Sequence, residues 1–201
     1  MKYVDLTVTL RDGMEVYPGD PEVKIAPVGE MPKDPCRLAA LSLGSHAGTH
    51  MDAPAHMVLK GRTLDQVPVN HFFGRAQVFP GDTDFGQVDL TGLDFALLNF
   101  DWARKRSSGE FYQEYPAISS RNAAILSIAG LMGVGMDTPS VDNQETDLVN
   151  HHILLSSGLV LVEGLCNLDK LGTNPFHFIT LPMKWKNSDG APCRAIAILE
   201  G

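Results

Sequence analysis

Residues 45–56 read Ser-His-Ala-Gly-Thr-His-Met-Asp-Ala-Pro-Ala-His, and this stretch carries most of the information in the sequence. It contains three of the seven histidines of the chain, His46, His50 and His56, together with Asp52. These four residues are separated by even numbers of positions, so in an extended segment their side chains would all face the same way. Imidazole and carboxylate are ligands that suit zinc, manganese or iron. The stretch therefore predicts a metal site.

The same stretch cannot be straight if it serves one metal centre. Ten fully extended residues span about 33 Å, which is wider than any such centre. The segment must therefore curl, and Gly48 and Pro54 lie where bends are least costly. The alternative is a polar loop with a few solvated histidines.

A second group of candidate ligands lies about a hundred residues further on. Glu163 ends the run Gly-Leu-Val-Leu-Val that begins at residue 158 and is typical of a buried strand. A carboxylate there is costly unless it is paired or bound to a cation. His151 lies near the start of a predicted helix that leads into this strand, and His152 is a weaker candidate because it points about 100° away. The alternatives are an ion pair for Glu163 and a helix-surface position for His151.

Composition limits the function of the chain. It has 201 residues, a formal net charge of −8 and 44% hydrophobic residues. An acidic chain without a basic stripe is a poor binder of nucleic acid or membranes. No apolar run reaches the roughly 18 residues of a membrane span, and the N-terminus reads as a strand rather than a signal peptide. We therefore expect a cytoplasmic protein, and without repeats or linkers we expect one domain over residues 1–201.

Strand-like patterns outnumber helical ones. Two helices are predicted, one from Ser119 through residues 122–132 with Gly133 as its C-cap, and one over Leu148–Ser157 that Gly158 ends. A shorter helix is expected near Ala55. Runs of Val, Ile, Leu and Phe predict seven strands, at Tyr3–Leu10, Val23–Pro27, Arg37–Leu43, Arg75–Phe79, Phe95–Trp102, Leu159–Glu163 and Arg194–Leu199. These elements predict a mixed α/β domain with a largely β core.

Several separated motifs resemble those of one known family. The stretch from His46 to His56 is similar to the H-x-G-T-H-x-D-x-P-x-H signature of the cyclase and kynurenine formamidase superfamily of metal-dependent hydrolases. The resemblance extends along nearly the whole chain. Its other motifs are Asp5-Leu-Thr, Gly13-Met-Glu-Val-Tyr-Pro-Gly-Asp-Pro, residues 133–142, His151-His-Ile-Leu-Leu, Glu163-Gly-Leu-Cys-Asn-Leu, Leu181-Pro-Met-Lys, Asp189-Gly-Ala-Pro and Arg194-Ala-Ile-Ala.

This resemblance implies a fold and a set of partners. The fold is a single-domain swivelling β/α fold with a barrel-like mixed sheet and few flanking helices. The implied cofactor is one or two divalent ions, with zinc preferred and manganese as the alternative. The implied partners are a small-molecule substrate and further copies of the chain in a homodimer or homotetramer.

The resemblance also assigns roles to individual residues. It implies that the metal ligands are His46, His50, Asp52, His151 and Glu163, with Asp52 and Glu163 shared when two ions bind. His56 would lie beside the second ion and move protons, and could also be a ligand. Tyr17 would line the substrate pocket.

The implied activity is hydrolysis of a small formamide, amide or lactam by metal-bound hydroxide, as in arylformamidases. An aryl substrate fits an apolar pocket lined by Tyr17, Trp102 and Phe72, although a core position is an equal alternative for each. The family's kynurenine formamidases carry Trp where this chain has Tyr17, which leaves the substrate open. Two other functions remain: a lyase, dehydratase or cyclase that uses the cluster as a Lewis acid, and a non-catalytic domain with a structural metal.

Overall fold

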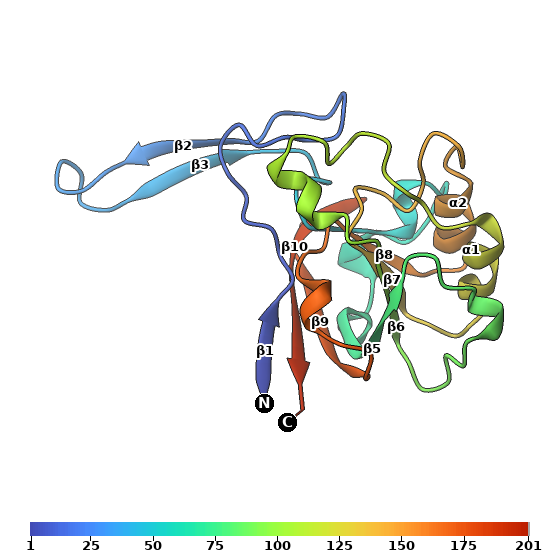
Figure 1. Ribbon diagram of the computed structural model, residues 1–201. Helices are drawn as coiled ribbons and strands as arrows, with labels where there is room; N and C mark the ends of the chain where they lie inside the picture. The colour runs from blue at the N-terminus through green and yellow to red at the C-terminus, as the bar shows by residue number, and fades with distance from the viewer. Residues whose placement is uncertain (201) are drawn as a thin grey trace.

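A closed ring of strands forms the centre of the molecule. The computed structural model describes residues 1–200, and within them seven strands pair in the order β10-β4-β8-β7-β6-β5-β9, with β9 pairing back to β10 (Figure 1). Strand β1 adds to the side of β10, so the two ends of the chain lie together. The strands are β1 Lys2–Asp5, β4 His50–Asp52, β5 Phe73–Pro80, β6 Phe95–Asn99, β7 Gly133–Met136, β8 Val160–Glu163, β9 Phe176–Pro182 and β10 Gly190–Leu199.

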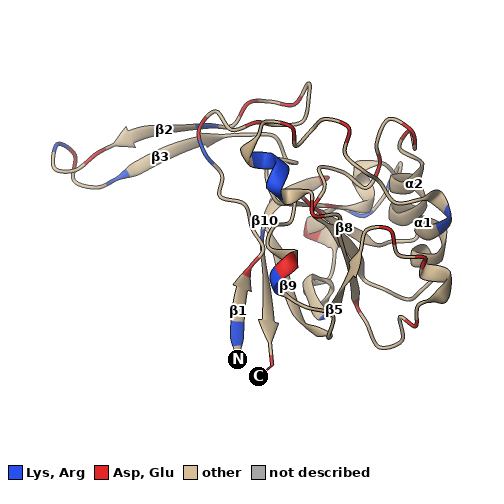
Figure 2. Cartoon of the chain, viewed as in Figure 1, with Lys and Arg blue, Asp and Glu red and all other residues tan. Residues whose placement is uncertain are grey.

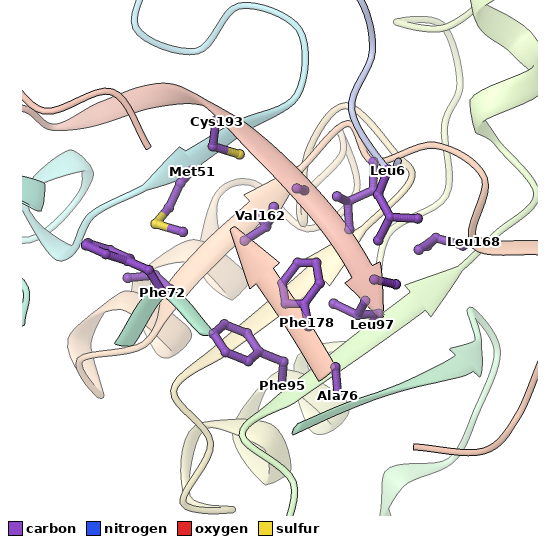
Figure 3. Close-up of a cluster of buried hydrophobic side chains, with 14 of the residues drawn as sticks. Leu6, Met51, Phe72, Ala76, Phe95, Leu97, Val162, Leu168, Phe178 and Cys193 are labelled. Atoms are coloured by element: carbon purple, nitrogen blue, oxygen red, sulfur yellow. The ribbon is translucent and has the colours of Figure 1, made fainter. Parts of the chain in front are cut away.

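Side-chain alternation along these strands separates two cores. In β6, Phe95 and Leu97 point into the ring, where they pack with Phe178 and Val162 (Figure 3). Ala96 and Leu98, which alternate with them, point outward to a second core beneath the helices. Because successive side chains of a strand face opposite sides, β5, β6 and β8 each supply both cores.

Two helices cover the outer face of the parallel strands β5 to β8. They are α1 Ser120–Ser127 and α2 Val149–Ser156, which pack against each other. The Ser119 hydroxyl accepts a hydrogen bond from the backbone N–H of Asn122 at 3.2 Å and caps α1, as the sequence predicts. The α2 helix also agrees with its prediction.

The predicted end of the first helix is wrong. Gly133 is not a C-cap but the first residue of β7, and the C-cap of α1 is Ile128, five residues earlier. Gly133 and Met132 both donate backbone hydrogen bonds to the Asp94 carbonyl. These bonds hold the segment in the sheet, although its helical periodicity predicts that it belongs to the helix. A Cβ atom on Gly133 would lie 2.7 Å from the Val160 carbonyl oxygen, which explains the glycine.

The prediction of an α/β fold with a barrel-like mixed sheet and few helices is confirmed. All seven predicted strands are present with shifted ends, and the short helix near Ala55 is a 3₁₀ turn, η1, over Pro54–His56. Strands β4, β7 and β9 carry histidine, glycine or polar residues in place of an apolar run and were not predicted. One domain over residues 1–201 stays a prediction, and Gly201 lies outside the described residues.

The remaining two strands form a separate hairpin. These are β2 Lys24–Gly29 and β3 Leu38–Ser42, which pair only with each other and extend away from the ring (Figure 1). None of the helices within residues 1–200 has the length and apolar character needed to span a bilayer.

Candidate metal centre

The two predicted groups of ligands meet on neighbouring strands. In the register of β4 and β8, His50 lies opposite Glu163 and Asp52 lies opposite Leu161. Met51 points into the ring, so His50 and Asp52 point outward, toward the face that α2 covers. His151, on the first turn of α2, thereby comes within reach of both carboxylates. The pairing of β4 with β8 thus brings together two groups of residues that are far apart in the sequence.

Each of the two carboxylates directs one oxygen toward His50 and the other toward His151. Asp52 Oδ1 and Glu163 Oε2 both lie 3.4 Å from His50 Nε2. Their other oxygens, Asp52 Oδ2 and Glu163 Oε1, lie 3.7 and 3.4 Å from His151 Nε2. This set of donors suits a divalent ion, and ligand atoms of His50, Asp52 and Glu163 all lie within 4.8 Å of one another.

These separations suit a bound cation better than direct hydrogen bonds. Zinc bonds of about 2.1 Å in tetrahedral geometry place ligand atoms about 3.4 Å apart, whereas charged hydrogen bonds are shorter, at about 2.7–2.9 Å. Asp52 is fully buried, and its Oδ2 atom has no hydrogen-bond partner. A buried carboxylate oxygen without a partner is costly, so the residues present fit a divalent ion.

Hydrogen bonds fix the ring orientation of two histidines. His50 Nδ1 lies 3.2 Å from the Gly48 carbonyl, which can only accept, so this nitrogen carries the proton and Nε2 is free to bind a cation. His151 Nδ1 lies 2.7 Å from Asp142 Oδ2, which turns its Nε2 toward Asp52 and Glu163 in the same way. Such outer carboxylates and carbonyls are typical partners of metal-binding histidines.

The electrostatics of the metal-free cluster favour cations. Burial lowers the pKa of His151, but the nearby carboxylates of Asp142, Asp52 and Glu163 outweigh it and raise the pKa to about 12. Burial also lowers the pKa of His46, which Asp52 and Asp189 raise to about 9. Protons thus occupy the cluster when no metal does, and a divalent ion would compete with them.

His46 and His56 lie at the open side of the cluster. His46 Nδ1 donates to Asp52 Oδ1 at 2.7 Å, and its Nε2 lies 3.0 Å from Asp189 Oδ2. The ring centroids of His46 and His56 are 4.1 Å apart. Gly190 leaves room for this arrangement, because a Cβ atom there would lie 2.5 Å from the His46 ring. Ligand atoms of His46, Asp52 and His56 all lie within 4.8 Å of one another, so His56 is close enough to be a ligand or a proton carrier.

The cluster forms the floor of a pocket of about 240 Å³. Tyr17 lies in the wall of this pocket, and its role in binding a substrate stays a prediction. Trp102 and Phe72 do not line it, so of the two alternatives for these residues the pocket position does not hold. Phe72 packs in the ring core, and the Trp102 indole donates to the Phe111 carbonyl at 2.8 Å. Phe111 and Tyr112 supply the aromatic wall instead.

The residues that support the cluster were not predicted from the sequence. Asp142 and Asp189 belong to motifs that carry the family resemblance, yet nothing in their spacing indicates contact with His151 and His46. The adjacent aromatic pair Phe111-Tyr112 lies in a stretch rich in glycine, serine and glutamate, and such a pair in a polar loop was the available signal for the pocket wall.

Comparisons with known proteins agree on one family. The family model described as "Putative cyclase" matches residues 4–143. The kynurenine formamidase of Salinibacter ruber is 32% identical, covering 98% of this chain and 97% of its own. That of Erythrobacter litoralis is 27% identical, covering 96% and 91%.

Solved structures agree with these relatives. A predicted metal-dependent hydrolase from Bacillus stearothermophilus is 25% identical with a TM-score of 0.81, covering 98% of this chain and 97% of its own. An isatin hydrolase bound to the product analogue thioisatinate has a TM-score of 0.86 at 22% identity, covering 100% and 93%, which shows a shared fold.

Proposed function

Because the chain belongs to the putative cyclase family, we propose that it is a metal-dependent amidohydrolase of small aryl formamides, amides or lactams, acting on C–N bonds other than peptide bonds. The observation that carries the proposal is the pair of buried carboxylates, Asp52 and Glu163, that face His50 on one side and His151 on the other beside an open pocket. Structural zinc sites are closed and usually contain cysteine, so an open site of histidine and carboxylate favours catalysis.

A divalent ion held by these residues would lower the pKa of water toward about 7 and polarise a carbonyl group. Zinc is our first choice and manganese the second, because both accept histidine and carboxylate ligands. Asp52 and Glu163 supply the negative charge that holds such an ion. Asp142 keeps His151 turned toward it through the 2.7 Å contact with the ring nitrogen.

His56 is suited to move the proton. Burial lowers its pKa below the ordinary value of 6.5, and although Asp52 opposes this effect, the ring is neutral at pH 7. A neutral imidazole accepts a proton from the attacking water and can return it to the leaving nitrogen. It lines the same pocket as Tyr17 and Tyr112, which gives it access to a bound substrate.

The pocket favours one aromatic ring. Tyr17 and Tyr112 approach edge to face with centroids 6.0 Å apart, and Phe111 and Tyr112 do so at 5.0 Å. Stacking against such rings contributes about 0.5–1.5 kcal/mol beyond the area buried. The relatives are described as kynurenine formamidases and the structural neighbour as an isatin hydrolase, and both substrate types contain an aryl ring beside a C–N bond.

A turnover screen tests this proposal. Protein loaded with zinc or manganese is incubated with N-formylkynurenine, isatin and N-formylaniline, and the acid product is analysed after reaction in ¹⁸O-labelled water. We expect metal-dependent turnover of at least one compound, with one solvent oxygen in the acid. Turnover without solvent oxygen would indicate a lyase or cyclase. Absence of turnover of every compound by the metal-loaded protein, together with unfolding when the metal is removed, would indicate a structural role.

A further inference from the structure

Arg106 is a partly buried cation that the proposed chemistry does not use. It lies in η5, a 3₁₀ turn over Ala103–Ser107 whose three consecutive basic residues form a continuous blue stretch in Figure 2. The side chain of Arg104 in this turn is 70% exposed, whereas the Nε atom of Arg106 is buried and has no hydrogen-bond partner within residues 1–200. Burying an incompletely paired cation is costly, so other contacts must hold Arg106 in this position.

The first of these contacts is with the aromatic wall of the pocket. The guanidinium carbon of Arg106 lies 3.5 Å from the centre of the Phe111 ring, well within the roughly 6 Å of a cation–π contact. Phe111 is 1% exposed and lines the pocket, whereas Arg106 does not belong to the pocket lining. Burial raises the pKa of the adjacent Tyr112, and the nearby charge of Arg106 opposes this effect. Arg106 therefore lies against Phe111 and close to Tyr112 without lining the pocket.

The second contact joins Arg106 to the strands that carry the candidate ligands. Its Nη2 atom donates to the Gly164 carbonyl at 3.3 Å, and the Thr49 hydroxyl donates to the same oxygen at 2.7 Å. Gly164 directly follows Glu163 at the end of β8, and Thr49 directly precedes His50 at the start of β4. This carbonyl is thus the point at which both ligand-bearing strands are linked to the guanidinium.

The glycine at position 164 is necessary for this contact. A Cβ atom there would lie 2.5 Å from Nη2 of Arg106 and 2.6 Å from the Gly48 carbonyl oxygen. Gly164 also has a φ of +66°, which residues with a side chain rarely adopt. The backbone after Glu163 is therefore shaped so that the guanidinium can approach it closely.

The η5 turn also holds the backbone of Phe111. Trp102, the N-cap residue of η5, donates from its indole Nε1 to the Phe111 carbonyl at 2.8 Å. The connecting residues 107–110 are all exposed, and Gly109 among them has a φ of +74°. An exposed connection with a glycine constrains its end only weakly. The contacts of Trp102 and Arg106, rather than the connecting backbone, therefore fix the position of Phe111.

We propose that Arg106 is a positioning residue for the aromatic wall, which fixes Phe111 and Tyr112 relative to Glu163 and so determines how tightly the pocket holds an aryl ring. This inference rests on the proposed function, because it assigns Arg106 to the affinity for an aryl substrate. The guanidinium acts through Phe111 and Gly164, and it is therefore not a catalytic residue.

The test uses two variants and a control. Arg106→Lys keeps the charge but lacks the planar guanidinium that stacks on a ring and donates in fixed directions. Phe111→Leu removes the same contact from the other side, which keeps the test decisive if Arg106→Lys does not fold. Arg104→Lys is the matched control, because Arg104 lies in the same turn and pairs with the exposed Asp101 at 2.9 Å. Circular dichroism checks that each variant is folded.

The first measurement does not depend on activity. The chain has two tryptophans, and Trp185→Phe in every protein leaves Trp102 as the only one. Because Trp102 is bonded to Phe111, we expect acrylamide to quench its fluorescence more strongly in Arg106→Lys and in Phe111→Leu than in the parent or in Arg104→Lys. Equal quenching in all four proteins would overturn the proposal.

The second measurement is the steady-state kinetics of the zinc-loaded proteins with N-formylaniline. We expect KM to rise roughly 2- to 12-fold in Arg106→Lys, the factor that loss of aromatic stacking would give, with kcat and zinc content unchanged. In the Phe111→Leu background, Arg106→Lys should raise KM no further, because the two residues act through one contact. An equal rise in Arg104→Lys, or a loss of kcat and zinc in place of the rise in KM, would overturn the proposal.

The two measurements separate this inference from the proposed function. If the unmodified protein turns over no aryl compound, the proposed function fails. The quenching of Trp102 then still decides whether Arg106 fixes the aromatic wall.

Discussion

Substitution of Asp142 by Asn tests whether the cluster is held for metal binding. Asp142 is 2% exposed, and it accepts hydrogen bonds from the Asn150 N–H at 3.0 Å, the His151 N–H at 2.7 Å and His151 Nδ1 at 2.7 Å. An asparagine keeps one acceptor oxygen but turns an NH₂ group toward at least one of these donors. The variant therefore loses a charged hydrogen bond and leaves a buried donor without a partner.

The substitution has two effects, one on the free energy of unfolding and one on the affinity for metal. Loss of a charged hydrogen bond costs about 1.5–3 kcal/mol in the free energy of unfolding. Loss of the carboxylate that orients His151 weakens metal binding about 10- to 100-fold, equivalent to about 1.4–2.7 kcal/mol. We expect both for Asp142→Asn. The measurements are a chelator competition titration for zinc and urea unfolding of the metal-free protein.

Asp137→Asn is the matched control. Asp137 is equally buried at 2% exposure and accepts backbone hydrogen bonds from Phe100 at 2.8 Å and Trp102 at 2.6 Å, but it contacts none of the candidate ligands. We expect this variant to lose stability and keep its zinc affinity. Equal zinc affinity in Asp142→Asn and the unmodified protein, or an equal loss in both variants, would refute the reasoning.

The stability effect should also depend on pH. Burial raises the pKa of Asp142, but the hydrogen bonds from His151 and Asn150 outweigh it and lower the pKa below 3.8 in the folded protein. A group whose pKa is depressed by folding stabilises the fold above its unfolded pKa, and this contribution disappears as the pH falls through the folded pKa. The difference between Asp142→Asn and the unmodified protein should therefore be full at pH 7 and shrink in acid below pH 3.8.

Three further predictions concern the cluster and the pocket. His56→Ala should keep most of the metal, measured by elemental analysis, and lose about 10²- to 10⁴-fold in kcat, since general acid–base catalysis contributes that much; undiminished turnover would exclude the role. Glu163→Gln should lower metal content, because it removes one of two charges facing the histidines, whereas Glu145→Gln on the exposed loop should not; full occupancy in the first variant would contradict its assignment as a ligand. The acid limb of kcat/KM should have its midpoint below pH 6.5, because His56 must be neutral to accept a proton and burial lowers its pKa; a midpoint above pH 7 would point to another group.

The sequence by itself determined the residue types of the site and their local arrangement. The even spacing from His46 to His56, together with Gly48 and Pro54, required a curled segment, and the chain does curl there, with Gly48 at φ +70° and a 3₁₀ turn at Pro54–His56. The run before Glu163 gave a buried strand because an apolar run is a local signal. The family resemblance supplied the fold and the expected ligand set, whose roles stay predictions.

Only the tertiary structure decided which residues surround that set. Asp142 and Asp189 reach His151 and His46 through strand and helix packing, and no local pattern encodes a contact of that kind.

Phe111 and Tyr112 replace Trp102 and Phe72 in the pocket wall, because burial in a core and exposure to a pocket look alike in an apolar residue type. Gly133 was likewise not predicted as a strand residue, because the residues that it pairs with in the ring, Phe95 and Val160, are distant in sequence. The physical reason is common to all of these cases: propensity and spacing act over a few residues, whereas strand register brings together residues a hundred positions apart.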